Sequence, residues 1–179
     1  MKAYYCHHFV LPLPAEHRFP MTKYARLYER VAASADALGV MLVEPRAATD
    51  EELCRAHDRR YVERATRGEL DAADLRKIGF PWSPLMIERS RRSSGGTMGA
   101  LEAALSGDGF AVNLAGGTHH AFADHGAGYC VFNDSVVAAL GADSSSTSTC
   151  TRATARPRWC ATILRSLRSP CMASATIRR

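Results

Sequence analysis

Two adjacent histidines, His119 and His120, are the residues of this 179-residue chain whose type and spacing most clearly suggest chemistry. They lie in the segment AGGTHHAFADHGAGY, which follows the apolar run Phe110–Leu114. Glycines allow the backbone of such a loop to turn sharply and to approach a substrate closely. Two imidazoles on it could act as a general base and a general acid near neutral pH. A solvated loop with two incidental histidines would give the same pattern, so the pair alone does not establish a site.

The segments around this loop alternate between strand-like and helix-like patterns. Runs of apolar, β-branched and aromatic residues predict strands over Lys2–Val10, Val40–Val43 and Phe110–Leu114. Helical spacing of apolar residues, with stop signals, predicts helices over Thr22–Leu38, Glu51–Ala56, Arg59–Arg67, Pro84–Arg92, Met98–Leu105 and Val136–Leu140, with a break at Gly95 and Gly96. This alternation predicts an α/β fold with an open, mostly parallel sheet flanked by helices. Ligands of such folds bind at loops that leave the carboxyl ends of strands, where the loop after Leu114 lies.

Capping residues predict where two of the helices begin. Thr22 is a suitable N-cap for the first helix, and Gly39 is a suitable stop. Thr49 and Glu52 have the spacing of a capping box, which predicts a helix immediately after Thr49.

The composition is that of an ordinary globular chain, with 46% hydrophobic and 23% charged residues. The length fits one domain with a substantial core. No run of about 18 apolar residues exists, so no membrane span is expected. The N-terminal segment MKAYYCHHFVLPLP makes a poor secretory signal, and the six cysteines form no CxxC pair. Both features predict a cytoplasmic protein with reduced thiols.

The positive charge is concentrated in the last part of the chain. The whole chain has a formal charge of +5, but residues 144–179 contain seven arginines and no Asp, Glu or Lys. The rest of the chain is therefore mildly acidic. The last part also shows neither alternation nor a sustained amphipathic period. The body and the tail need separate explanations.

Four ordered segments resemble motifs of one family. The segment GGTHHAFADHGAGYCVFND resembles the signature loop of the histone deacetylase and acetylpolyamine amidohydrolase superfamily, with its paired histidines and its GFC- or GYC-type segment. RFPMTKYARLYERV resembles the FPM-x-KY segment of bacterial and class IV-like members, and AHDRRYVERA resembles their HDP-x-Y-type helix. GFPWSPLMIERSRRSSGGT resembles the helix and loop before the signature strand. The likeness covers roughly residues 1–141 and implies the N-terminal part of an arginase-like or deacetylase-like fold.

The resemblance implies roles for individual residues. His119 and His120 match the catalytic pair, of which one activates a metal-bound water and the other supports proton transfer to the leaving amine. Gly128 and Tyr129 match the step that lines the channel for an acyl-lysine-like chain. Cys130 follows in the motif, and we interpret it as a packed core thiol.

Structural roles are expected for the other polar candidates. A family motif contains His57, Asp58 and Tyr61, and we favour a structural role for it. His7 and His8 are interpreted as strand-end residues. Asp134 is interpreted as a cap of the helix that follows it rather than as a catalytic group.

The chemistry of this family requires zinc, which polarises an amide carbonyl and generates a nucleophilic water at an open coordination position. The resemblance implies ligands from an Asp-x-His strand soon after the signature loop and a second Asp much later, with a Tyr donor to the oxyanion later still. The segment after Leu140 contains only Asp143 and no histidine. We therefore expect that this chain supplies none of the metal ligands, binds no zinc and is inactive.

We propose that the unusual tail is a frameshifted reading of the missing strand. Codons that can encode Ser146–Trp159, read one base earlier, translate as VDLDVHQGNGTAAM, which resembles the missing zinc-ligand strand and the loop after it. Only about one base per codon is free in this translation, because every amino acid except Ser, Arg and Leu nearly fixes the first two bases of its codon. We therefore expect residues 1–141 to be the N-terminal part of a deacetylase domain and residues 142–179 to be an aberrant, disordered basic tail.

Two functions of different classes remain open from the sequence. The first is a zinc-dependent deacetylase acting on an acetylated lysine or polyamine, inactive in this truncated form. The second is a non-catalytic binding protein whose basic tail binds an acidic or nucleic-acid partner, with nucleic acid the less favoured. Zinc dependence of an in-frame version would favour the enzyme, and salt-dependent binding to nucleic acid would favour the binding protein.

Overall fold

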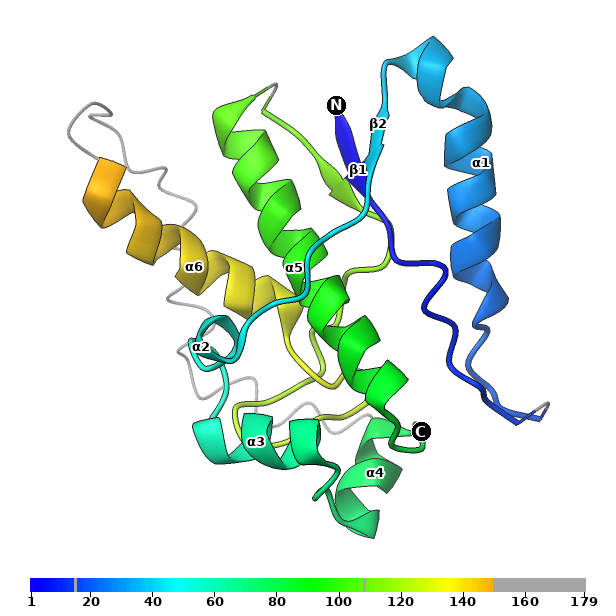
Figure 1. Cartoon of the computed structure of the whole chain (residues 1–179), viewed down its shortest axis with the longest axis vertical. Helices are drawn as coiled ribbons and strands as arrows, with labels where there is room; N and C mark the ends of the chain where they lie inside the picture. Colours follow the sequence, from blue (N-terminus) through cyan, green and yellow to red (C-terminus); the bar gives the residue numbers. More distant parts are fainter. Residues whose placement is uncertain (15, 108, 150–179) are drawn as a thin grey trace, which may run out of the picture. The chain divides into compact units, whose positions relative to one another are not determined.

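The computed structural model describes residues 1–14, 16–107 and 109–149. Met1–Ala142 form one compact unit, and the fold is that of this unit (Figure 1). In the part of the chain that the structure describes, none of the helices combines the length and the hydrophobicity that a membrane span requires. The boundary expected at residue 141 stays a prediction. Most of the expected disordered tail, residues 150–179, lies outside the described residues.

A three-stranded parallel sheet with the order β2-β1-β3 forms the centre of the unit. Its strands are β1 (Lys2–Tyr4), β2 (Met41–Val43) and β3 (Val112–Asn113). Ala3, in the middle of β1, lies opposite Leu42 on one side and Val112 on the other. The predicted α/β class with a parallel sheet is confirmed.

All three strands are shorter than predicted. The pairing of β1 ends at Tyr5, whose amide donates to the carbonyl of Val43 over 3.0 Å. The chain then turns, because the amide of Phe9 donates to the carbonyl of Cys6 over 3.2 Å. The prediction of a strand as far as Val10 is therefore wrong, since local turn bonds take the place of the ladder after Tyr5.

Six helices accompany the sheet within the described residues. They are α1 (Thr22–Leu38), α2 (Asp50–Leu53), α3 (Arg59–Arg67), α4 (Ala72–Ile78), α5 (Pro84–Ser106) and α6 (Asp134–Thr149). In Figure 1, α1 lies along β2, and α5 lies along β1 and β3. The helix α4 was not predicted, although Asp71 marks its start by accepting the amides of Ala73 and Asp74, each over 2.8 Å.

The predicted helix ends are only partly correct. Gly39 ends α1 with φ 61°, a left-handed conformation that favours glycine. The N-cap of α1 is Met21, which caps with no side-chain bond, and Thr22 is already helical. The capping box is confirmed: Thr49 Oγ1 accepts the amide of Glu52, and the Glu52 carboxylate accepts the amide of Thr49.

The helix α5 is continuous through Gly95 and Gly96, so the predicted break between two helices is wrong. These two glycines allow neighbouring segments to pack closely against the backbone of α5. A Cβ on Gly95 would lie 1.9 Å from the carbonyl oxygen of Arg46, and a Cβ on Gly96 would lie 2.8 Å from Nδ2 of Asn113. The helix therefore keeps its glycines because the chain before α2 and the end of β3 touch its backbone.

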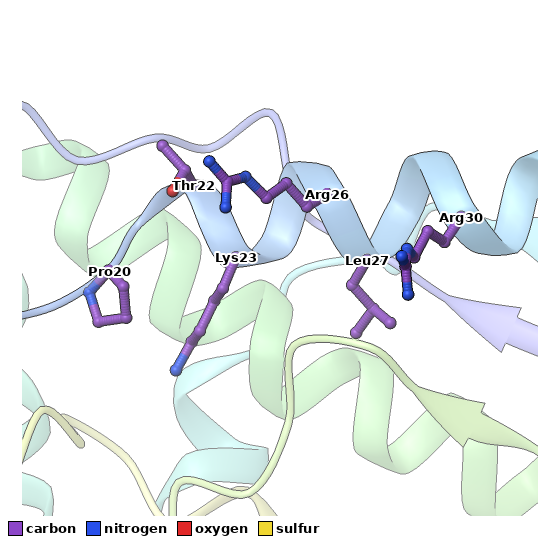
Figure 2. A pocket seen from close by; sticks show the side chains of 6 residues that line it. All are labelled: Pro20, Thr22, Lys23, Arg26, Leu27 and Arg30. Atoms are coloured by element: carbon purple, nitrogen blue, oxygen red, sulfur yellow. The ribbon is translucent and has the colours of Figure 1, made fainter.

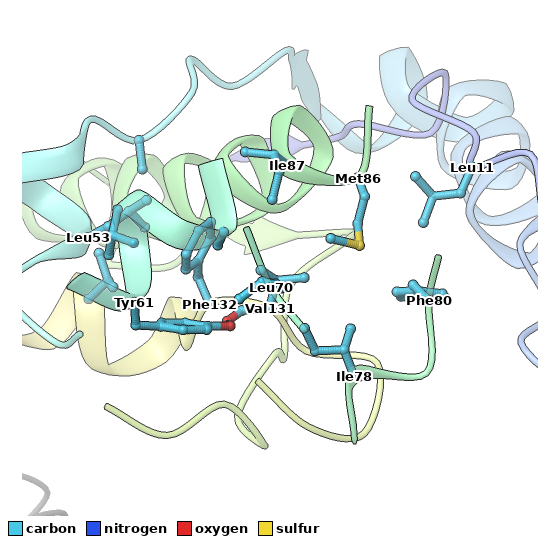
Figure 3. Close-up of a cluster of buried hydrophobic side chains, with 14 residues drawn as sticks. Leu11, Leu53, Tyr61, Leu70, Ile78, Phe80, Met86, Ile87, Val131 and Phe132 are labelled. Carbon is cyan, nitrogen blue, oxygen red and sulfur yellow. The ribbon is translucent and has the colours of Figure 1, made fainter. Parts of the chain in front are cut away.

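A buried apolar cluster holds the helices to the end of the signature segment (Figure 3). Val131 and Phe132, which directly follow Cys130, are 2% and 1% exposed. They pack with Tyr61 and Val62 of α3 and with Met86 of α5. Burial of each such side chain stabilises the fold by about 2 kcal/mol. The cluster therefore fixes the point at which the loop carrying His119 and His120 returns to the core.

The close approach at Gly95 predicts an inverted effect of alanine. In a helix interior, Gly→Ala ordinarily stabilises by about 1 kcal/mol. We expect Gly95→Ala to destabilise by about 3 kcal/mol, because its methyl group would overlap the Arg46 carbonyl. Urea unfolding measures the change, and Ser106→Ala at the exposed end of α5 is the control. A stabilised Gly95→Ala protein would contradict the observed packing.

Candidate functional site

The loop that carries the two histidines leaves the sheet at the carboxyl end of β3 and returns at the start of α6. The amide of Leu114 donates to the carbonyl of Tyr4 over 2.8 Å, so the loop starts beside the end of β1. Carboxyl ends of parallel strands share one edge of a sheet, which is the usual place for ligands in such folds. The structure thus places the loop where the sequence predicted it.

The imidazoles of His119 and His120 lie side by side and exposed, with ring centroids 4.1 Å apart. Nδ1 of His119 is 2.9 Å from the carbonyl oxygen of Gly117. Because a carbonyl oxygen only accepts, Nδ1 carries the hydrogen of the neutral ring and Nε2 is its free acceptor. Nε2 is therefore the atom of His119 that can take a proton from a reacting group.

The channel residues predicted from the sequence lie next to this pair. A Cβ on Gly128 would lie 3.3 Å from the ring of His120, so the backbone at Gly128 passes directly against that imidazole. The structure therefore brings His119, His120, Gly128 and Tyr129 together on one exposed surface.

Asp134 fixes the backbone just before the histidines. Its carboxylate is fully buried and accepts the amides of Gly117 over 2.8 Å and Thr118 over 2.9 Å. The amide of Asp134 donates in return to Oγ1 of Thr118 over 3.2 Å. Hydrogen bonds to an ionised carboxylate are about twice as strong as neutral ones. The position of the histidine pair thus depends on this side chain.

The interpretation of Asp134 as a helix cap is wrong. The cap of α6 is Asn133, whose Oδ1 accepts the amide of Val136 over 3.2 Å. Asn133 Nδ2 also donates to the carbonyls of His119 and Ala121, over 3.3 and 3.0 Å. Asn133 therefore caps the helix, whereas the neighbouring Asp134 binds the loop.

A polar network links Asp134 to β3 and α5. Thr97 Oγ1 lies 2.6 Å from Oδ2 of Asp134 and accepts from Nδ2 of Asn113 over 2.9 Å. A Cβ on Gly116 would come within 2.9 Å of atoms of all three side chains, so only glycine fits there. Thr97 and Asn113 were not predicted from the sequence, although a polar Asn113 in an otherwise apolar strand was a signal.

His57 holds the other side of the same loop. Its Nε2 accepts the amide of Asn133 over 2.9 Å, so Nδ1 carries the hydrogen and donates to the carbonyl of Phe122 over 2.8 Å. Burial lowers the pKa of His57, and hydrogen bonds to the backbone of Phe122 and Ala123 partly offset this. The neighbouring amide of Asp58 donates to the carbonyl of Ala123 over 2.8 Å.

Tyr61 completes this support, because its hydroxyl donates to the carbonyl of Val131 over 2.9 Å. Burial is the main reason why the pKa of Tyr61 is raised far above its ordinary value. The motif of His57, Asp58 and Tyr61 therefore makes structural contacts around the loop, as its interpretation from the sequence proposed.

Gly128 and Tyr129 form a tight turn between Ala127 and Cys130, which pair as an isolated antiparallel bridge. Both turn residues have positive φ, 55° and 66°, as in a type I′ turn. Tyr129 is the only non-glycine residue with positive φ in the described part of the chain. Its amide donates to the carbonyl of Ile78 over 2.7 Å, which holds this costly conformation.

Three aromatic rings lie near the ring of Tyr129. The rings of Phe19 and Phe80 lie 4.9 and 5.2 Å from it, and that of His17 lies 5.9 Å away. His17 is held by Nε2, which donates to the carbonyl of Gly79 over 2.8 Å, and by Nδ1, which accepts the amide of Phe19. His17 could not be predicted from the sequence, apart from its place before the FPM segment.

Cys130 is buried behind this turn, and burial raises the pKa of its thiol. Its Sγ lies 3.4 Å from the carbonyl oxygen of Gly128. A buried thiol with a raised pKa is a poor nucleophile. The interpretation of Cys130 as a packed thiol agrees with these contacts.

His7 and His8 lie in the turn after β1 and apart from the pair. The ring of His7 stacks on Tyr28 with centroids 3.8 Å apart. Nε2 of His8 lies 3.5 Å from a carboxylate oxygen of Glu44, which follows β2. His7 therefore connects the turn after β1 to α1, and His8 connects the same turn to the residue that follows β2.

Among the described residues, no group of three or more His, Cys, Asp and Glu side chains could hold a metal ion. A catalytic zinc ion needs three protein ligands and one open position. The side chains that the structure describes do not fit zinc by themselves. The expectation that this chain binds none stays a prediction.

Comparison with known proteins identifies the family. The family model described as histone deacetylase domain matches residues 17–153. The chain belongs to the histone deacetylase family. The HD domain of HDA15, a solved member of the same fold, superposes with a TM-score of 0.66 at 17% identity. The superposed region includes 80% of this chain and 43% of the HDA15 chain, which supports the predicted deacetylase-like fold.

Histone deacetylase relatives are longer than this chain. An uncharacterized protein of Picosynechococcus sp. is 36% identical over 130 residues, which are 73% of this chain and 43% of that protein. The acetoin utilization protein AcuC of Bacillus subtilis is 36% identical over 106 residues, which are 54% of this chain and 27% of AcuC. The histone deacetylase clr6 of Schizosaccharomyces pombe is 31% identical over 109 residues, 55% of this chain and 27% of clr6. This chain thus spans less than half the length of these relatives.

The buried position of His57 predicts acid sensitivity of the fold. Its pKa is lowered in the folded protein from the ordinary value of 6.5. Its contribution to stability is complete above pH 6.5 and is lost as the pH falls through the folded pKa, because the unfolded chain then binds more protons.

The variant His57→Gln should therefore lose less stability than the wild type between pH 7 and pH 5. Urea unfolding at each pH gives the free energies of unfolding. The Ser106→Ala variant, which changes an exposed side chain and removes no titratable group, is the control and should keep the wild-type slope. Equal slopes for His57→Gln and wild type would show that His57 does not carry the effect.

Proposed function

We propose that this chain is the N-terminal part of a zinc-dependent deacetylase, in which His119 and His120 handle the protons of amide hydrolysis. The substrate is an acetylated lysine or polyamine. One observation carries the proposal: two imidazoles are fixed 4.1 Å apart at the carboxyl edge of the sheet, beside the Gly128-Tyr129 turn. Membership of the histone deacetylase family supports it. A cytoplasmic location is part of the same proposal.

Hydrolysis of an acetyl amide needs a group that takes a proton from water and a group that gives one to the leaving amine. Nε2 of His119 is the free acceptor of its ring and suits the first task. His120, packed against Gly128, suits the second because it lies nearer the channel turn. The exposed ring of Tyr129 offers an apolar wall for the aliphatic part of an acyl-lysine chain.

Zinc would supply Lewis-acid activation of the amide in an intact family member. The residues that the structure describes do not include a set of side chains that could bind zinc. We propose that its ligands belong to the strand that the altered reading frame replaces after residue 143, and to sequence that an in-frame product would carry beyond residue 179. On this proposal the chain in its present form has no deacetylase activity.

Correction of the reading frame tests the proposal. A one-base correction near codons 141–145 should replace the Ser/Thr/Arg tail by a strand with Asp-x-His and extend the chain to about family length. The corrected protein should hydrolyse acetyl-lysine or acetylpolyamine substrates and lose this activity with a chelator. His120→Ala should lower the rate by about 10²–10⁴, the usual scale for a general acid–base.

His125→Ala removes a histidine of the same loop that we assign no catalytic task, and it should leave the rate largely unchanged. The present chain should stay at background with or without zinc. An immediate stop codon in the corrected frame, or a full-length zinc-loaded protein inert on both substrate classes, would refute the proposal and favour the binding protein.

A further inference from the structure

The exposed side of α1 presents three cations in succession. Lys23, Arg26 and Arg30 recur at three- and four-residue spacing, so they lie on adjacent turns of one face, and all three are exposed. Arg26 and Arg30 are four residues apart and repel each other, so this spacing does not stabilise the helix. We call these three residues with Leu27 the basic face of α1.

This face borders a surface hollow of about 410 Å³ (Figure 2). Its lining comes from the basic face together with Pro20 and Thr22, and contains no carboxylate. Within the described residues, neither Arg26 nor Arg30 forms an ion pair. Leu27 is 41% exposed, which adds an apolar surface between the cations.

The charge is local and not a property of the whole unit. Residues 1–142 contain 16 Lys and Arg against 17 Asp and Glu. Glu29 is also exposed on α1, but it does not line the hollow. Some arginines of the unit have acidic partners, such as Arg64 with Asp74 at 2.7 Å, whereas Arg59 and Arg60 form no ion pair within the described residues. The basic face differs from these arginines because it lines a hollow, so its guanidinium groups can bind a negative ligand there.

The basic face begins beside the candidate site. The ammonium group of Lys23 lies over the ring of Phe19, 4.5 Å from its centroid. The ring of Phe19 in turn lies 4.9 Å from the ring of Tyr129. A segment of extended chain that places one side chain at Tyr129 would thus bring its neighbouring residues to Lys23 and the hollow.

We propose that the basic face of α1 binds acidic residues flanking the acetylated lysine of a protein substrate; this rests on the proposed function. Arginine guanidinium groups suit carboxylates, which they can bind with two parallel hydrogen bonds. An apolar residue of the same segment packs on Leu27 and Pro20. Because polyamines and lysine-rich tails are cationic, the same face disfavours them through like-charge repulsion. The substrate class is therefore an acetyl-lysine within an acidic protein segment.

Peptide binding to the chain as it exists tests this inference without any turnover. Two fluorescein-labelled peptides share one acetyl-lysine and one leucine and differ only in acidic or basic flanking residues. Fluorescence anisotropy should show binding of the acidic peptide alone. Arg26→Ala with Arg30→Ala should weaken it about tenfold, as expected for two lost charge contacts. High salt should weaken it as well.

Two further variants make the result specific. Arg59→Ala with Arg60→Ala removes the same charge from exposed positions on α3 and should leave binding within about twofold. Arg26→Glu with Arg30→Glu should bind the basic peptide in preference to the acidic one. Circular dichroism confirms that each variant is folded.

Equal binding of both peptides, or an equal loss in the α3 control, would overturn the inference. So would displacement of the peptide by a DNA oligomer or by anionic vesicles at lower concentration than by unlabelled acidic peptide. Failure of the proposed function is distinguishable, because a frame-corrected protein inert on all substrates leaves this binding intact. A frame-corrected enzyme that prefers basic-flanked peptides would overturn the inference alone.

Discussion

The carboxylate of Asp134 is the group on which the candidate site depends. It is fully buried and binds two consecutive loop amides, at Gly117 and Thr118, together with the hydroxyl of Thr97. A buried carboxylate is costly unless its acceptors are satisfied, so these donors and the carboxylate require one another. The two histidines follow immediately after the bound amides. The backbone from which the two histidines extend is therefore held by a buried side chain.

Two other buried side chains, those of His57 and Tyr61, also hold the backbone around the loop. His57 binds the loop at Phe122 and the start of α6 at Asn133, and Tyr61 binds Val131 at the edge of the core. The loop is thus held at both ends by buried groups while its middle stays exposed. This division between a fixed frame and an accessible pair suits proton transfer, which requires precise placement of the groups that exchange protons.

Local chemistry made part of this structure predictable from the sequence. The extent of α1 and the capping box at Thr49 follow from residues adjacent in the chain, and the signature motif placed both histidines at the carboxyl edge of the sheet. Features that depend on distant contacts were not predictable. Gly95 resembles a helix break unless the approach of Arg46 is known, and Asp134 resembles a cap unless the path of the loop is known.

Hydrogen exchange of the amides of Gly117 and Thr118 tests most directly whether Asp134 holds the loop. In the wild type both amides should exchange slowly despite their place in a surface loop. In Asp134→Ala both should exchange rapidly, while the amide of Leu114, bonded to Tyr4, stays protected and reports an intact sheet. Unchanged protection of Gly117 and Thr118 in Asp134→Ala, or fast exchange in the wild type, would contradict the account.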